Sequence, residues 1–199
     1  FPYTPIANPR YMVADWSFGI QDENMQKVVD EVRAQGAQVV VLLSHNGMDV
    51  DLKMASRVRG IDAIFGGHTH DGVPVAVPVA NPGGKTLVTN AGSNSKFLGL
   101  MDFDVKGGKV ADFRYRLLPI FANQLKADAE MAALITKVRA PYEAKLADKL
   151  AVTDGLLYRR GNFNGTFDQL ILDALMEVKG AEIGFSPGFR WGTSLLPGQ

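Results

Sequence analysis

The stretch AQVVVLLSHNGMDVDLKMASRVRGIDAIFGGHTH, residues 37–70, contains two apolar runs separated by an amphipathic one. Residues 39–43, VVVLL, are aliphatic without a break, and residues 61–67, IDAIFGG, are again mostly apolar and end in two glycines. Short apolar runs of this kind predict strands that are buried on both faces of a sheet. Residues 52–58, between them, predict a short helix. Strand, helix and strand in this order are typical of a layered α/β domain.

Further elements on both sides of this stretch support the same fold class. Upstream, residues 23–35 have a helical spacing of apolar side chains, and Gly36 follows where a glycine commonly ends a helix. Downstream, apolar patterning predicts three strands, over residues 86–90, 98–105 and 109–119. The sequence Lys-Gly-Gly at residues 106–108 predicts a tight hairpin turn between the last two strands.

The pattern changes after the predicted hairpin. Residues 124–150 carry apolar side chains on one helical stripe, with Pro141 expected to kink or restart the helix. Residues 168–179 then predict a helix, and AEIGF at residues 181–185 predicts another buried strand. We therefore expect three regions: an α/β domain over residues 1–122, a bridging helix over 123–151, and the start of a second α/β domain over 152–199.

Composition excludes several classes of function. The 21 basic and 21 acidic side chains leave a formal net charge of zero, so no net field attracts nucleic acid or an anionic membrane. No apolar run approaches the roughly 20 residues that a bilayer-spanning helix needs. The absence of cysteine excludes disulfides and thiolate metal ligands within these residues. Specificity is therefore expected to come from a local site.

The three histidines of the chain all follow predicted strands. His45 comes at the end of one strand, and His68 and His70 come just after the next. Because open α/β sheets bind ligands at the carboxyl edge of their strands, we predict a metal site formed by these imidazoles. The alternative is three unconnected surface or hydrogen-bonding histidines. Asn46 and Asp71, which flank these histidines, are candidates to support the ligands or to line a channel.

The histidine-containing segments resemble a known superfamily. SHNGMDVD at residues 44–51 and GIDAIFGGHTH at 60–70 resemble the last two metal-binding motifs of the metallophosphoesterases, in their 5′-nucleotidase branch. Residues 91–105 are similar to the hairpin that follows these motifs. Within the branch, three phrases resemble the SoxB family of thiosulfohydrolases; they are FPYTPIANPRYMVADWSFGI (1–20), YRRGNFNGTFDQLI (158–171) and GFSPGFRWG (184–192).

This resemblance implies part of an αββα sandwich and part of a two-metal site. It implies that His45 and His68 bind one divalent metal ion and His70 the other, with manganese as the usual metal. The family's other ligands, and its catalytic residues, belong to motifs that do not occur in these 199 residues. The sequence therefore reads as an internal fragment, and we expect the isolated fragment to be inactive.

The resemblance also implies a substrate and a partner. SoxB enzymes release sulfate from a cysteine-bound S-sulfonate on the SoxYZ carrier, and they work with other Sox components in the periplasm. Two alternatives stay open. One is a 5′-nucleotidase or cyclic phosphodiesterase, and the other is a non-enzymatic, metal-dependent interaction domain.

Candidate substrate-binding residues lie in the last region. By resemblance, Arg190 corresponds to an arginine that reaches the substrate oxyanion, and a guanidinium fork suits sulfonate and phosphate oxygens. Alternatively, Arg190 is a surface arginine stacked on an aromatic neighbour. Arg160, Asn162 and Asn164 form a polar, glycine-flanked loop that either lines the channel for the carrier peptide or is a structural turn.

Overall fold

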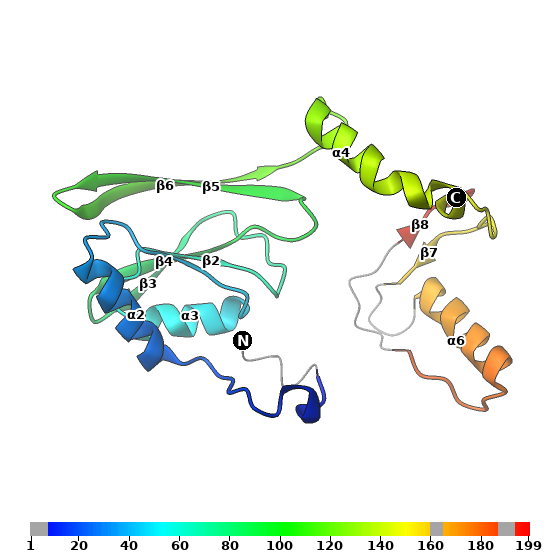
Figure 1. Cartoon of the computed structure of the whole chain (residues 1–199), viewed down its shortest axis with the longest axis horizontal. Helices are drawn as coiled ribbons and strands as arrows, with labels where there is room; N and C mark the ends of the chain where they lie inside the picture. Colours follow the sequence, from blue (N-terminus) through cyan, green and yellow to red (C-terminus); the bar gives the residue numbers. More distant parts are fainter. Residues whose placement is uncertain (1–7, 160–164, 187–193) are drawn as a thin grey trace. The chain divides into compact units, whose positions relative to one another are not determined.

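The structure, a computed structural model, describes residues 8–159, 165–186 and 194–199 (Figure 1). It divides into two compact units, Phe1–Lys126 and Ala127–Gln199, which are described separately. The three-region division into 1–122, 123–151 and 152–199 stays a prediction.

A four-stranded sheet forms the centre of the first unit. Its strands are β1 (Val41–Leu43), β2 (Ala63–Gly66), β3 (Val77–Asn81) and β4 (Gly84–Asn90), in the order β1-β2-β4-β3. Strands β1, β2 and β4 are parallel, whereas β3 pairs with β4 in the antiparallel direction. The three parallel strands therefore end at one common edge.

Helices cover one face of this sheet and a hairpin covers the other (Figure 1). Helices α2 (Asp22–Ala34) and α3 (Met48–Arg57) bury an apolar cluster against the sheet; its fully buried members are Val29, Met54, Ala55, Val58, Ile61, Ile64 and Val88. Strands β5 (Phe97–Lys106) and β6 (Lys109–Pro119) pack aromatic and aliphatic side chains over Ala63, Ala76 and Leu87. This layering confirms the predicted α/β class and matches part of an αββα sandwich.

Most of the elements predicted in this unit are present, with shifted bounds. Helix α3 begins at Met48, four residues before the predicted start, with Gly47 in the N-cap position. The hairpin turn is as expected, because Gly107 and Gly108 have φ angles of 58° and 75° that suit a type I′ turn. Strand β3 is missing from the sequence prediction. It contains a proline at position 78, which is tolerated because β3 lies at the edge of the sheet.

The prediction that residues 39–43 are buried on both faces is wrong. Strand β1 lies at the end of the sheet, and among the described residues only β2 pairs with it. Val41 and Leu43 are 36% and 78% exposed. The apolar run correctly predicts a strand. Its burial, however, also depends on neighbouring strands, and a described strand pairs with β1 on one side only.

The second unit is mainly helical. The predicted bridging helix consists of α4 (Ala129–Arg139), a short 3-10 turn (Ala140–Tyr142) and α5 (Glu143–Leu146), interrupted at Pro141 as expected. Helix α6 (Thr166–Lys179) confirms the next predicted helix. A two-residue antiparallel pair joins β7 (Leu157–Tyr158) to β8 (Ser194–Leu195).

The predicted strand over residues 181–185 is wrong. These residues follow α6 without strand structure, and Ile183 and Phe185 are 72% and 87% exposed. A strand requires a partner for its backbone hydrogen bonds, and no described strand pairs with this segment. The backbone N–H of Ala181 instead donates to the carbonyl of Met176 at the end of α6.

None of the helices in the described part of the chain is long and apolar enough to cross a membrane.

Candidate metal centre

The chain brings two of the predicted ligands together at the carboxyl edge of the sheet. Strand β1 pairs with β2 through Leu43 and Phe65, and the backbone N–H of Ser44 extends this pairing to the Phe65 carbonyl at 2.9 Å. His45 and His68 each lie two residues beyond the end of their strand. Their ring centroids are 5.3 Å apart with an interplanar angle of 70°. Neighbouring parallel strands thus place two imidazoles side by side, as the sequence predicts.

The loop that carries His68 and the third histidine, His70, has an unusual backbone. His68 and His70 have φ angles of 74° and 60°, in the left-handed region that few residues other than glycine adopt. Between them, the backbone N–H of Thr69 donates to the Gly67 carbonyl at 3.0 Å, which makes a very tight turn. Such strain costs roughly 1–3 kcal/mol per residue and clusters at functional sites.

Two glycines allow the loops to approach closely. A Cβ atom on Gly67 would lie 3.1 Å from Nδ1 of His45, and one on Gly66 would lie 2.6 Å from Oδ2 of Asp51. The second distance is shorter than real Cβ contacts allow, so position 66 requires glycine. The two glycines therefore permit close approach of the backbone at this edge.

Asn46 and Asp71 both take part in hydrogen bonds within these loops. The backbone N–H of Asn46 donates to Oγ of Ser44 at 3.2 Å. Oδ2 of Asp71 accepts from the Thr69 hydroxyl at 2.5 Å, and that hydroxyl oxygen accepts from the backbone N–H of Met48 at 3.2 Å. Thr69 therefore connects the GGHTHDG loop, residues 66–72, to the start of α3. The supporting role predicted for Asp71 beside an imidazole stays a prediction.

Sequence reasoning missed two buried polar residues at this edge. Asp51 is 0% exposed, and one of its carboxylate oxygens, Oδ1, accepts a hydrogen bond from Oγ of Ser44. Burial raises the pKa of Asp51, although the bond from Ser44 and the nearby His45 act in the opposite direction. Asn90 is 2% exposed at the end of β4. The sequence GMDVD contains a signal that could have located Asp51, because acidic residues are typical of the first turn of a helix and two of them lie in the first turn of α3.

The donor chemistry fits part of a metal site. Two adjacent imidazoles provide nitrogen ligands of the kind that Zn, Mn and Fe sites accept. Within residues 8–159, 165–186 and 194–199, no group of three or more His, Asp or Glu side chains is close enough to hold an ion. A complete donor set therefore needs groups besides those described.

The predicted substrate-binding residues lie outside the described residues. These are Arg190 and the loop residues Arg160, Asn162 and Asn164.

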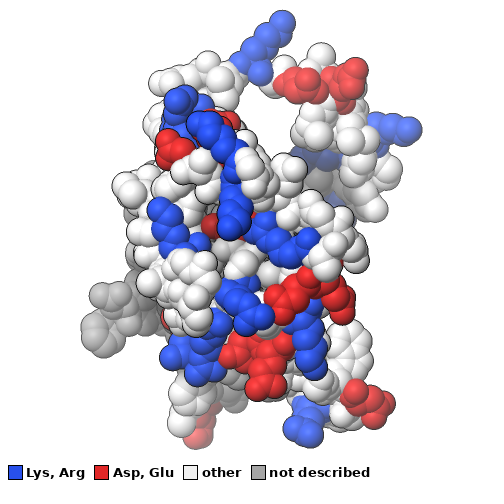
Figure 2. Space-filling model, turned by 90° about the vertical axis from the view of Figure 1, so that its left-hand side faces the viewer, with Lys and Arg blue, Asp and Glu red and all other residues white. Residues whose placement is uncertain are grey.

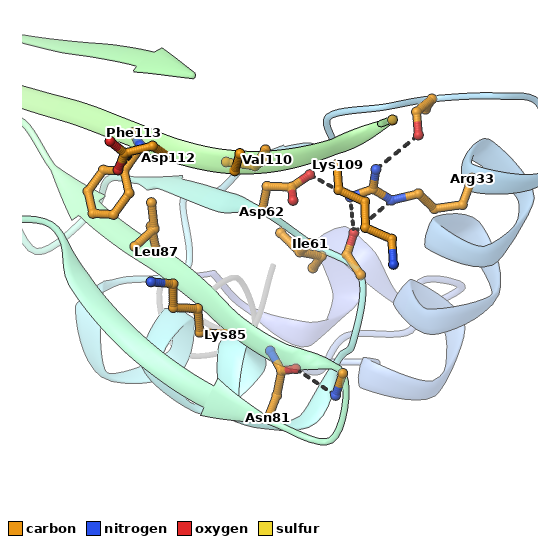
Figure 3. A pocket seen from close by; sticks show the side chains of 15 residues that line it. Arg33, Ile61, Asp62, Asn81, Lys85, Leu87, Lys109, Val110, Asp112 and Phe113 are labelled. Atoms are coloured by element: carbon orange, nitrogen blue, oxygen red, sulfur yellow. Dashed lines mark hydrogen bonds and ion pairs between the residues drawn. The ribbon is translucent and has the colours of Figure 1, made fainter. Parts of the chain in front are cut away.

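The other end of the sheet contains a cavity that is not lined by histidine. It has a volume of about 570 Å³ and is lined by charged side chains that include Arg33, Asp62, Lys85 and Lys109 (Figure 3). Arg33 is engaged there in hydrogen bonds to three backbone carbonyls and to Asp62. By contrast, His45 lines an open hollow of about 460 Å³ beside the end of β1.

Charge is mixed on the face of the molecule shown in Figure 2. Lysine and arginine side chains are spread over much of this face, and aspartate and glutamate lie among them in smaller clusters.

Comparisons with known proteins agree with the geometry. No protein-family model matches the chain. The structure of the sulfate thiohydrolase SoxB from Thermus thermophilus matches 100% of this chain and 36% of its own, with 38% identity and a TM-score of 0.82. A 5′-nucleotidase precursor from Thermus thermophilus matches 80% of this chain and 35% of its own, with 27% identity and a TM-score of 0.69. Rat 5′-nucleotidase is 28% identical over 155 residues, which are 69% of this chain and 26% of the rat protein.

The fold and these matches fit a fragment of a protein of the 5′-nucleotidase branch of the metallophosphoesterases. Within that branch, the chain resembles SoxB over its whole length. It spans about a third of the solved structures and about a quarter of the rat protein.

Proposed function

We propose that this chain is part of a two-metal hydrolase that releases sulfate from a cysteine-bound S-sulfonate on a SoxYZ carrier. The observation that carries this proposal is the match to SoxB along the entire chain, at 38% identity. A periplasmic location and interaction with other Sox components belong to the same proposal.

His45, His68 and His70 would provide part of the ligand set for two divalent ions, which we propose to be manganese. Such ions, when bound, supply charge stabilisation and a water of lowered pKa. The chain's own contribution is positional. Parallel strands fix two imidazoles 5.3 Å apart, and a strained, glycine-rich turn fixes the backbone of the third. Arg190 would bind the sulfonate oxygens through its guanidinium group.

The proposed reaction is a hydrolysis that needs no oxidant. In the thiosulfonate form of this substrate, Cys–S–S–SO₃⁻, a sulfane sulfur joins the cysteine sulfur to the sulfonate. The oxygen of water bonds to the sulfonate sulfur, the bond between that sulfur and the sulfane sulfur breaks, and sulfate leaves, while one proton of the water passes to solvent. The released sulfane sulfur stays on the carrier cysteine and takes up a proton.

A phosphoesterase is the second candidate. The observation that favours it is the match to 5′-nucleotidases from Thermus thermophilus and rat, over 80% and 69% of this chain. Both substrates present tetrahedral oxyanions, so the described site alone suits either.

The experiment that separates the candidates uses the full-length protein that contains this chain. Sulfate release from a thiosulfonate-loaded carrier is compared with phosphate release from nucleotides, each in the presence of manganese. We expect sulfate release, and we expect His68→Ala to abolish it while Thr153→Ala in the second unit leaves it unchanged. Phosphate release from nucleotides without sulfate release would show that the enzyme is a phosphoesterase instead.

A further inference from the structure

The buried carboxylate of Asp51 lies between the two histidine-bearing loops. Asp51 belongs to the first turn of α3 and is 0% exposed. Its Oδ1 accepts from the Ser44 hydroxyl at 2.5 Å, and the oxygen of that hydroxyl accepts from the backbone N–H of Asn46 at 3.2 Å. These two hydrogen bonds hold the residues on both sides of His45. The backbone of His45 is thereby fixed by contacts that do not involve its ring.

The second carboxylate oxygen of Asp51 faces the other loop. Oδ2 lies 2.6 Å from the position that a Cβ atom of Gly66 would take, and it has no hydrogen-bond partner in the described structure. The amide nitrogen of Asn90 lies 3.7 Å from that same position and donates to the Gly67 carbonyl at 3.5 Å. Asp51 and Asn90 thus contact the glycine pair that precedes His68.

A carboxylate in this position is costly. Burying a charged group without full hydrogen bonding destabilises a fold by several kcal/mol, on the order of the desolvation penalty of an unpaired ion. A buried polar network that is only partly satisfied is expected at a functional site rather than in an ordinary core.

We propose that Asp51 is a positioning residue, which acts through Ser44 to fix His45 relative to the GGHTHDG loop. The inference rests on the proposed function in that His45 is taken as a metal ligand. Asp51 itself touches neither ion nor substrate in this proposal.

The test uses Asp51→Ala, Asp51→Asn and Ser44→Ala in the full-length protein. Two quantities are measured: the dissociation constant for Mn²⁺ by calorimetry, and the hydrogen-exchange rate of the Asn46 amide by NMR. Asp49→Asn is the matched control, because Asp49 lies in the same helical turn but is exposed.

We expect Asp51→Ala and Ser44→Ala to weaken Mn²⁺ binding by about 10–100-fold, the range seen when groups that orient metal ligands are removed. Exchange of the Asn46 amide should accelerate in both variants. Asp51→Asn should stay within about threefold of wild type, because its amide oxygen still accepts from Ser44. Asp49→Asn should change neither quantity.

The proposal is overturned if Asp51→Ala and Ser44→Ala lower the melting temperature but leave Mn²⁺ affinity and Asn46 exchange unchanged. That outcome would make Asp51 a purely structural residue. If Asp51→Ala does not fold, Ser44→Ala decides by the same two criteria. If the wild-type protein does not bind Mn²⁺, the proposed function fails. The proposal for Asp51 is then decided by the Asn46 amide alone: faster exchange in Ser44→Ala supports it, and unchanged exchange overturns it.

Discussion

The two ends of the parallel strands in the first unit contrast sharply. At the carboxyl end, glycines, left-handed histidines and a buried, partly satisfied carboxylate gather in two tight loops. At the amino end lies a cavity of about 570 Å³ (Figure 3). Arg33 donates there to the carbonyls of Gly60, Ala37 and Gln38 and to the carboxylate of Asp62. At the amino end Arg33 and Asp62 form an ion pair, whereas at the carboxyl end His68 and His70 have left-handed backbones and one carboxylate oxygen of Asp51 has no hydrogen-bond partner in the described structure. Local chemistry, rather than volume, therefore locates the candidate site.

The strongest test of this contrast is Gly66→Ala at the carboxyl end. The new Cβ atom would meet Oδ2 of Asp51 at 2.6 Å and the backbone oxygen of Thr89 at 3.1 Å. We expect the free energy of unfolding to decrease by about 2–3 kcal/mol, because the added methyl group overpacks a tight interior. Mn²⁺ affinity of the full-length protein should fall more than about tenfold, because both loops must shift. Urea unfolding and calorimetry measure the two effects.

Gly155→Ala is the matched control for that substitution. The φ angle of Gly155 lies outside the left-handed region, and no atom lies within 4 Å of the position that its Cβ atom would take. We expect no loss of stability and no change in Mn²⁺ affinity. Equal effects of both alanine variants would contradict the view that Gly66 is required by contact with Asp51.

At the amino end, Arg33→Ala should reduce stability without reducing metal binding. The substitution removes hydrogen bonds to the Gly60 carbonyl and the ion pair with Asp62, whose side chain is 20% exposed. We expect a loss of about 1–2 kcal/mol in the free energy of unfolding, since acceptors are left without donors. A Mn²⁺ affinity reduced as much as in Gly66→Ala would show that the two ends are not independent.

Leu43→Lys probes the carboxyl end outside the buried network. Leu43 is 78% exposed on β1, which is an edge strand among the described residues, so we expect a change in stability within about 0.5 kcal/mol. Because a lysine on an edge strand opposes strand addition, self-association measured by light scattering should decrease. Val75→Lys, at 73% exposure away from that edge, is the control and should leave association unchanged. A large loss of stability would show that β1 is more deeply packed than its exposure indicates.

The smallest effect is expected from Arg57→Gln, which removes an exposed ion pair between α3 and α2. The hydrogen bond from Arg57 lowers the pKa of Asp22 below 3.8 in the folded state. A lowered pKa stabilises the fold above the unfolded-state pKa, and this contribution is lost as pH falls through the folded-state pKa. The difference in stability between wild type and variant should thus be small at neutral pH and vanish in acid. A difference that persists in acid would indicate that packing of the arginine stem, not charge, is responsible.

Most of the first unit could be predicted from its sequence, because periodicity and turn residues act locally. The pair Gly107 and Gly108 specifies the hairpin turn, and the apolar spacing over residues 23–35 specifies α2. Strand β3 could not be predicted in this way, because Pro78 is acceptable only at a sheet edge. The opposite occurs at residues 181–185, where the apolar pattern predicts a strand that the structure lacks. No described strand pairs with this segment.

The candidate site was predicted in part for the same reason. Each histidine follows a recognisable strand, so the sequence places all of them at the carboxyl edge. Asp51 was missed because the predicted helix began after it, and because its burial is produced by packing against the loop of Gly66 rather than by any local pattern.

The sequence by itself determined which residues can carry the chemistry: three imidazoles at two strand ends, preceded in one case by paired glycines. Only the tertiary structure decided that β1 and β2 are neighbours, that the rings of His45 and His68 lie 5.3 Å apart, and that Asp51 is buried between their loops. The physical reason is the range of the forces involved. Backbone propensity acts over a few residues, whereas strand pairing and burial join groups that are far apart in the chain.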